Sequence, residues 1–152
     1  MSGAGAPKLN IDASGLQVAV LVTSWHTTIT DGLLAGAERA LTAARNTEYE
    51  IWRVPGAFEL PLAAQRAAAA GADAIVALGV VIQGDTPHFD FVCAAATDGL
   101  TRVQLDTGVP IGFGLLTVDN EQQALDRAGL EGSREDKGAE AVEAAVLMAR
   151  LK

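Results

Sequence analysis

The chain alternates short apolar runs with segments in which apolar residues recur every three or four positions. The runs are rich in Val, Ile, Leu and Ala, which is typical of strands buried on both faces of a sheet. The predicted strands are residues 16–24, 49–54, 74–82 and 110–118. The predicted helices are residues 30–44, 58–70, 88–105, 121–128 and 137–151. Strands that alternate with helices predict an α/β three-layer sandwich, with a four-stranded parallel sheet covered by helices on both faces.

The polar residues that could carry chemistry lie where the predicted strands end. In open α/β sheets ligands bind outside the carboxyl ends of the strands. This rule selects four segments, which are residues 24–26, 56–59, 81–88 and the stretch from Thr117 onward. We therefore look for a site at that edge of the sheet.

The third of these segments, VIQGDTPHFD, starts a helix. Pro87 suits the first helical position and Thr86 suits the N-cap. Gly84 permits close approach of a ligand, and free N–H groups at a helix start favour an anion. The helix dipole favours a neutral His88, which could then accept a proton near pH 7. A simple helix start with a structural histidine and half of an active site both remain open at this point.

Two further segments contain an aromatic ring and a carboxylate that admit two interpretations each. Trp25 covers the edge of the core or offers a flat platform for a planar heterocycle. Glu59 complements the dipole of a helix start or accepts hydrogen bonds from substrate hydroxyls. His26 has no recognisable partner, and we interpret it as a surface residue.

The same choice applies to three residues toward the C-terminus. Arg127 satisfies the last carbonyls of a helix or binds phosphate through its planar fork. Lys137 pairs with the two acids before it or contacts a ligand. Phe113 lies within a predicted strand, where a core position is the default.

Composition and charge exclude several classes of protein. A length of 152 residues predicts about one domain, and a net charge of −8 argues against nonspecific nucleic-acid binding. The single cysteine, Cys93, excludes an internal disulfide and favours a reducing compartment. Residues 1–14 contain no apolar signal core, so we expect a cytoplasmic protein. We expect these residues to form a flexible arm before a single domain at residues 15–152. No dinucleotide fingerprint, P-loop, nucleophile elbow or metal constellation is found, so we expect no cofactor and no metal.

With these residues assembled, the chain closely resembles the lumazine synthases, and actinobacterial members in particular. The resemblance runs from about Gly15 to the C-terminus. It rests on the motifs SWHTTITDGLLAGA, VPGAFELP, ALGVVIQGDTPHFDFV, FGLLT, EQQALDRAG and EDKGAEAVEAA. It implies a flavodoxin-like sheet of order 2-1-3-4. It also implies a cofactor-free transferase of riboflavin biosynthesis that joins 5-amino-6-(D-ribitylamino)uracil to 3,4-dihydroxy-2-butanone 4-phosphate, giving 6,7-dimethyl-8-ribityllumazine, water and phosphate.

The resemblance also implies roles for individual residues. The catalytic residues would be His88, which transfers protons, and Arg127, which also binds phosphate. The remaining phosphate ligands would be Gly84, Asp85 and Thr86. Substrate contacts would come from Trp25 by stacking, from Ala57, Phe58 and Glu59 to the ribityl chain, from Val81, Ile82 and Gln83 to the pyrimidine edge, and from Phe113 and Lys137.

Three positions depart from the family pattern. Many relatives carry a basic residue where this chain has Gln83, so the site loses one positive charge. Asp85 adds a negative charge beside the expected phosphate, and we expect its side chain to turn away and leave backbone N–H contacts. Trp25 replaces the phenylalanine of many members, an exchange that preserves stacking.

The resemblance further implies a homopentamer in which Phe113, Arg127 and Lys137 reach the site of a neighbouring subunit. Some members close into shells of sixty subunits through a tight turn, whereas the link LEGSREDKG is longer and more polar, so we expect an isolated pentamer. Riboflavin synthase is an expected partner; its all-β pattern excludes this chain from being that enzyme. A non-catalytic lumazine or flavin carrier on the same fold is the competing function, disfavoured because His88 and Arg127 are both present.

Overall fold

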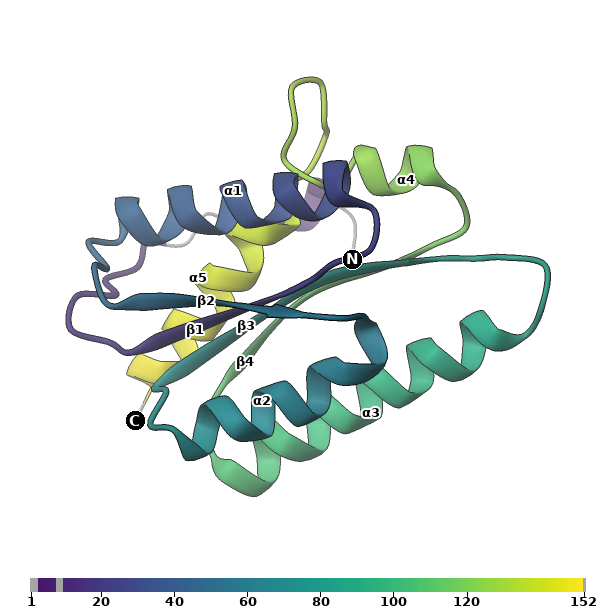
Figure 1. Ribbon diagram of the computed structural model, residues 1–152. Helices are drawn as coiled ribbons and strands as arrows, with labels where there is room; N and C mark the ends of the chain where they lie inside the picture. Colours follow the sequence, from purple (N-terminus) through teal and green to yellow (C-terminus); the bar gives the residue numbers. More distant parts are fainter. Residues whose placement is uncertain (1–2, 8–9, 152) are drawn as a thin grey trace.

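A four-stranded, all-parallel sheet forms the centre of the molecule (Figure 1). The computed structural model describes residues 3–7 and 10–151. The sheet order is β2-β1-β3-β4, which confirms the predicted fold class and strand order. The strands are β1 (Val18–Thr23), β2 (Tyr49–Val54), β3 (Ala74–Ile82) and β4 (Ile111–Val118).

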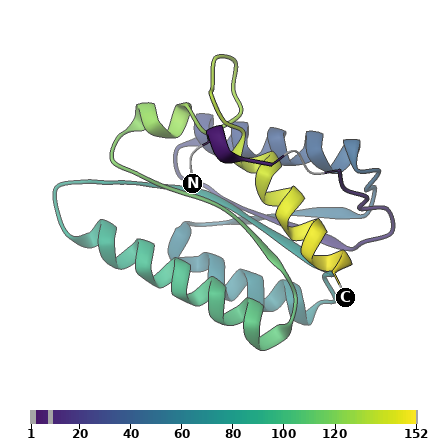
Figure 2. The ribbon, with the colours of Figure 1, turned by 180° about the vertical axis from the view of Figure 1, so that it is seen from behind.

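Helices cover both faces of the sheet. They are α1 (Thr27–Ala43), α2 (Leu60–Ala69), α3 (His88–Thr107), α4 (Glu121–Leu125) and α5 (Lys137–Arg150), with single 3-10 turns η1 (Gly3–Gly5) and η2 (Ala57–Glu59). α1 and α5 lie on one face, and α2 and α3 lie on the other (Figures 1 and 2). Each face has its own core, with β1 side chains such as Val20 in one and Leu21 in the other. All six residues of β1 are buried, which explains its continuous apolar run.

Glycines allow α5 to lie very close to its neighbours. A Cβ at Gly138 would collide with the carbonyl oxygen of Leu33 in α1, and one at Gly112 would collide with the carbonyl of Ala141. These contacts fix the start of α5, and with it the loop that precedes it.

Two helices end at a glycine with a left-handed backbone. After α2, Gly71 has φ +100°, and the N–H groups of Gly71 and Ala72 donate to Ala68 and Ala67. This is a Schellman motif, in which glycine adopts the left-handed conformation at low cost. Gly108, with φ +73°, also has a left-handed backbone at the end of α3, where its N–H donates to the carbonyl of Gln104 at 2.9 Å.

Two predicted boundaries, each by three residues, and one predicted N-cap are wrong. α1 begins at Thr27 rather than residue 30, because the carbonyl of His26 already accepts the N–H groups of Ile29 and Thr30. α4 ends at Leu125 rather than residue 128, because Ala128 pairs with Asp136 in an antiparallel bridge.

The third concerns the start of α3. Its N-cap is Pro87 rather than Thr86, and the Thr86 hydroxyl lies 3.4 Å from the N–H of His88. The helical residues themselves start at His88, as predicted.

The last residues of the predicted N-terminal arm are held against the domain. Arg150 donates to the carbonyls of Asp12 and Ser14, and Asn46 donates to the carbonyl of buried Ala13. Hydrogen bonds from Ser14 and the charge of Arg45 hold the pKa of Asp12 well below its usual value. Residues 1–2 and 8–9 of the arm lie outside the described residues.

Candidate active site

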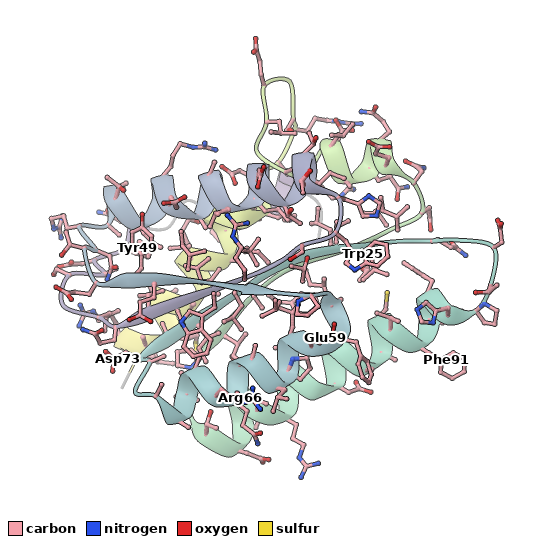
Figure 3. The ribbon with its side chains drawn as sticks, in the orientation of Figure 1. Trp25, Tyr49, Glu59, Arg66, Asp73 and Phe91 are labelled. Atoms are coloured by element: carbon pink, nitrogen blue, oxygen red, sulfur yellow. The ribbon has the colours of Figure 1, made fainter. Side chains whose placement is uncertain are left out.

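A pocket of about 590 Å³ opens at the carboxyl ends of the strands, where the sequence placed the site. Three segments from different parts of the chain form it: the loop after β1, the turn η2 after β2, and the end of β3 with the start of α3. Its lining residues are Trp25, His26, Gly56, Ala57, Phe58, Glu59, Val80, Val81, Ile82, His88, Phe91 and Val92. Figure 3 shows Trp25 above Glu59, and Phe91 near the start of α3.

The Trp25 ring is presented to the pocket instead of covering the core. Its side chain is 66% exposed, and a Cβ at Gly56 would lie 3.3 Å from the indole nitrogen. Its loop is anchored by Ser24, whose N–H donates to Pro55 and whose hydroxyl donates to Val54. The geometry favours the platform interpretation, because a flat ring stands at the mouth of an apolar pocket.

His26 also lines the pocket, so interpreting it only as a surface residue misses its position. Its backbone is left-handed, with φ 55° and ψ 67°, and its ring centroid is 6.4 Å from that of Trp25. A non-glycine residue in this conformation is uncommon and is often found at functional sites. The available signal in the sequence is its place directly after Trp25 at a strand end.

Glu59 and Phe58 lie in the turn η2, where the N–H of Glu59 donates to the carbonyl of Gly56 at 3.2 Å. Glu59 is half-buried and immediately precedes α2, so it complements the dipole and also faces the pocket. Phe58 is 66% exposed, an unusual degree for so large an apolar side chain. Both interpretations of Glu59 are thus compatible with one position.

The third segment divides into residues that line the pocket and residues that do not. Half-buried Val81 and Ile82 line it, as does His88. Gln83 extends the sheet, because its N–H donates to Val118 at 2.9 Å. Gln83, Gly84, Asp85 and Thr86 are exposed beyond the pocket wall.

Phe91 is a pocket residue that sequence reasoning missed. It is 73% exposed and follows His88 by three positions, so the two side chains share a face of α3. That spacing is the signal that could have identified it.

Phe113, Arg127 and Lys137 are not part of the pocket of their own chain. Phe113 is 48% exposed on β4, so the default core assignment is wrong. Within the described part of the chain, β4 pairs only with β3 and is an edge strand of the sheet. Its edge leaves the ring of Phe113 uncovered.

Arg127 and Lys137 flank an ordered hairpin loop between α4 and α5, which projects above α1 in Figure 1. Arg127 donates to the carbonyl of Gln123 at 2.9 Å, which confirms the helix-end interpretation. Lys137 lies 3.2 Å from Glu135, which confirms pairing with one of the acids before it. Its second partner is Glu140 at 3.2 Å, because Asp136 instead caps α5.

The carboxylate of Glu135 was not singled out by sequence reasoning. Its side chain is 10% exposed and lies between Arg127 Nε at 3.4 Å and Lys137 Nζ at 3.2 Å. The contact with Lys137 is an ion pair without hydrogen-bond orientation. Burial opposes the charge of Lys137, but Glu135 and Glu140 outweigh it and raise its pKa, so its ammonium is charged at neutral pH.

Within residues 3–7 and 10–151, no three potential metal ligands come together. In the same part of the chain, none of the helices has the length and apolarity to cross a bilayer. An apolar cleft with one indole, one carboxylate and two imidazoles suits a planar, polyhydroxylated small molecule.

The fold and pocket therefore define a class: a parallel α/β protein that binds a small planar ligand at the carboxyl ends of its strands. Comparison with known proteins is more specific. Residues 15–152 match the family model of 6,7-dimethyl-8-ribityllumazine synthase. The chain belongs to this family.

Curated relatives with the same name support the assignment along nearly the whole chain. The protein from Kineococcus radiotolerans is 68% identical over 96% of this chain and 91% of its own length. The protein from Leifsonia xyli is 62% identical over 98% of this chain and 95% of its own. The protein from Streptomyces avermitilis is 61% identical, covering 98% and 93%. All three organisms are actinobacteria, as the motifs suggested.

Proposed function

We propose that this chain condenses 5-amino-6-(D-ribitylamino)uracil with 3,4-dihydroxy-2-butanone 4-phosphate. The products are 6,7-dimethyl-8-ribityllumazine, water and phosphate, in the penultimate step of riboflavin biosynthesis. Family membership over residues 15–152 supports the reaction. The observation that carries it is the pocket, in which Trp25, Glu59 and His88 meet from three separate segments.

The pocket suits the pyrimidine substrate. Its ring would stack on Trp25, and its ribityl hydroxyls would donate to Glu59 beside the backbone of Ala57 and Phe58. Backbone groups of residues 81–83 would read the polar edge of the ring, since strand ends offer free N–H and C=O groups. This arrangement would place the reactive amine near His88.

The reaction needs repeated proton transfer. The amine attacks the ketone, and the carbinolamine loses water to give an imine. Elimination of phosphate leaves an enol that tautomerises to a second ketone, and the ribityl-bearing nitrogen attacks this ketone and closes the ring with loss of a second water. Each step moves a proton, so one imidazole that both gives and accepts protons is suited to the sequence. Exposed at the first turn of α3, His88 can exchange its proton with solvent between steps.

The phosphate would bind between the start of α3 and Arg127. Gly84, Asp85 and Thr86 would offer backbone N–H groups, with the Asp85 side chain directed to solvent. Because Arg127, Lys137 and Phe113 lie outside the pocket of their own chain, we place them in the site of an adjacent subunit of a homopentamer. Exposed Phe58, Phe91 and Phe113 support such an assembly, since apolar surface of this kind marks interfaces.

The function is tested by incubating the purified chain with both substrates and following lumazine absorbance and inorganic phosphate together. We expect the two products to appear in equal amounts. A chain that binds lumazine or riboflavin but forms neither product would instead be a carrier on the same fold. The presence of both His88 and Arg127 favours catalysis over that alternative.

The cellular setting follows from the pathway rather than from the structure. We propose a cytoplasmic protein with one domain, residues 15–152, and an N-terminal arm. The protein would require no cofactor or metal. Riboflavin synthase, which consumes the product, is the proposed partner. Co-purification of the two proteins from the same cells would test that pairing.

A further inference from the structure

The proposed function assigns two cations, Arg127 and Lys137, to the binding of substrate. The carboxylate of Glu135 lies between them. Its oxygens lie 3.4 Å from Arg127 Nε and 3.2 Å from Lys137 Nζ. With a side chain only 10% exposed, it is far more buried than Arg127 at 37%. A nearly buried carboxylate interacts strongly with neighbouring charges, because water screens it little.

The backbone holds the two cations in place without help from this carboxylate. The N–H of Lys137 donates to the carbonyl of Arg127 at 3.0 Å, and the N–H of Glu135 donates to Asp126 at 2.9 Å. Ala128 and Asp136 form the bridge between them. Glu135 therefore contributes charge to the loop more than it contributes shape.

The charges of the cluster cancel. Lys137 contacts both Glu135 and Glu140, so the two cations face two carboxylates. Arg127 directs Nε at Glu135 and Nη1 at Gln123, and its Nη2 has no recorded acceptor among the described residues. A phosphate that approaches Arg127 could accept a hydrogen bond from Nη2. At Nε it would compete with the carboxylate of Glu135.

We propose that Glu135 is an internal counter-anion that competes with phosphate for Arg127 and Lys137 and so limits the affinity of the site for phosphate. This rests on the proposed function, which places the substrate phosphate on Arg127. Phosphate is both part of a substrate and a product, so a weaker hold speeds its departure after elimination. The affinity for phosphate depends on two opposing effects: attraction by Arg127 and Lys137, and repulsion by the carboxylate of Glu135.

The state of Lys137 supports this account. Although burial disfavours its charge, Glu135 and Glu140 raise its pKa, which means that the carboxylates satisfy the ammonium internally. An ammonium already paired twice attracts an external anion less than a free one does. Removal of either carboxylate would leave the two cations facing a single carboxylate.

The test is the affinity of the assembled full-length protein for inorganic phosphate, measured by calorimetry. A second arm measures the KM for 3,4-dihydroxy-2-butanone 4-phosphate, which separates free phosphate from the phosphate ester. For Glu135→Gln, nearly the same shape without the charge, we expect the phosphate Kd to fall about tenfold. The KM should fall in the same direction, and kcat should fall where phosphate release limits turnover.

Two matched variants control for the change of charge. Glu140→Gln also removes a carboxylate from Lys137 but not from Arg127, so a smaller tightening is expected. Glu131→Gln removes an exposed charge elsewhere in the same loop and should leave the Kd unchanged. A purely structural role for Glu135 predicts the opposite sign, because a disordered loop binds phosphate more weakly.

Unchanged or weaker phosphate binding in Glu135→Gln overturns the proposal. If that variant does not assemble, Glu140→Gln decides alone, and an unchanged Kd there overturns it as well. Failure of the proposed function would look different, because the wild-type protein would then form no lumazine at all.

Discussion

At the scale of residues, the pocket contains two kinds of residue. Some are proposed to contact the substrate, and others only shape the walls. Trp25 and His88 are presented by a loop and a helix start, while Gly56 is small so that the indole can lie against the turn beside it. The sequence predicts these positions because strand ends are marked by abrupt changes from apolar to polar residues. The sequence does not predict the contact of Glu135 with Arg127, because an ion pair across a hairpin leaves no periodic signal. It places His26 at a strand end but does not predict its left-handed backbone.

The first prediction concerns His88. We expect His88→Ala to reduce turnover by about 10²-fold to 10⁴-fold and to leave measurable activity, since positioning of two substrates supplies the rest. Steady-state kinetics with both substrates checks this. Wild-type turnover in the variant would remove His88 from the mechanism, and wild-type binding of lumazine would show that the pocket is intact.

Arg127→Ala should be the more damaging change, because it misplaces the phosphate that must leave. We expect a larger loss of kcat/KM than for His88→Ala, with KM for the phosphate ester raised and KM for the pyrimidine little changed. Arg134→Ala is the matched control, since Arg134 is an arginine of the same loop with an exposed side chain that pairs with Asp126. Near-normal turnover of Arg127→Ala would contradict the phosphate role.

At the scale of elements, close packing of α5 decides where the hairpin loop stands. The spacing of apolar residues along the chain predicts the strands and helices, and all four strands lie where the sequence predicts. The early end of α4 does not follow, because the bridge between Ala128 and Asp136 competes with helix continuation and joins residues distant in the pattern. Local periodicity predicts elements, whereas contacts between loops determine their ends.

This packing predicts that Gly138→Ala destabilises the protein. The new Cβ would collide with the carbonyl of Leu33, so α5 must shift, at a cost of about 1–3 kcal/mol. Denaturant unfolding at a fixed protein concentration measures this loss. Gly84→Ala is the control for stability alone, because its Cβ would meet nothing within 4 Å.

A half-buried acid in α5 gives a pH-dependent prediction. Burial, followed by the charges of Glu140 and Asp136, raises the pKa of Glu143. The folded state therefore holds the proton more tightly than the unfolded state does, and ionised Glu143 costs stability above its pKa. Glu143→Gln should stabilise the protein by a few tenths of a kcal/mol at pH 7, since partial exposure screens the effect. The gain should vanish as the pH falls below the ordinary pKa of glutamate; a gain that persisted there would rule out a charge effect.

At the scale of the whole molecule, the residues of the proposed site fall into two groups that do not meet within one chain. The pocket lies at the carboxyl ends of β1, β2 and β3, while Phe113 on β4 and the loop bearing Arg127 and Lys137 lie apart from it. Exposed aromatic rings occur in both groups, with Phe58 and Phe91 at the pocket and Phe113 on β4. Sequence patterns describe one chain, so a site completed by a neighbour is visible only through family resemblance.

We predict an isolated pentamer in solution. Size-exclusion chromatography with light scattering should give the mass of five copies of the 15.7-kDa chain. The hairpin between α4 and α5 is the element that distinguishes this expectation from a closed shell. A particle of sixty subunits would contradict it.

The central claim is that the pocket of one subunit works with the Arg127 loop of the next. Co-expression of two differently tagged variants, Arg127→Ala and the double variant Trp25→Ala/His88→Ala, tests it most directly. Mixed oligomers purified through both tags contain sites that take an intact pocket from one chain and an intact loop from the other. The account predicts recovery to about a quarter of wild-type activity for random assembly of equal amounts. Activity no greater than the mean of the two variants alone would contradict it.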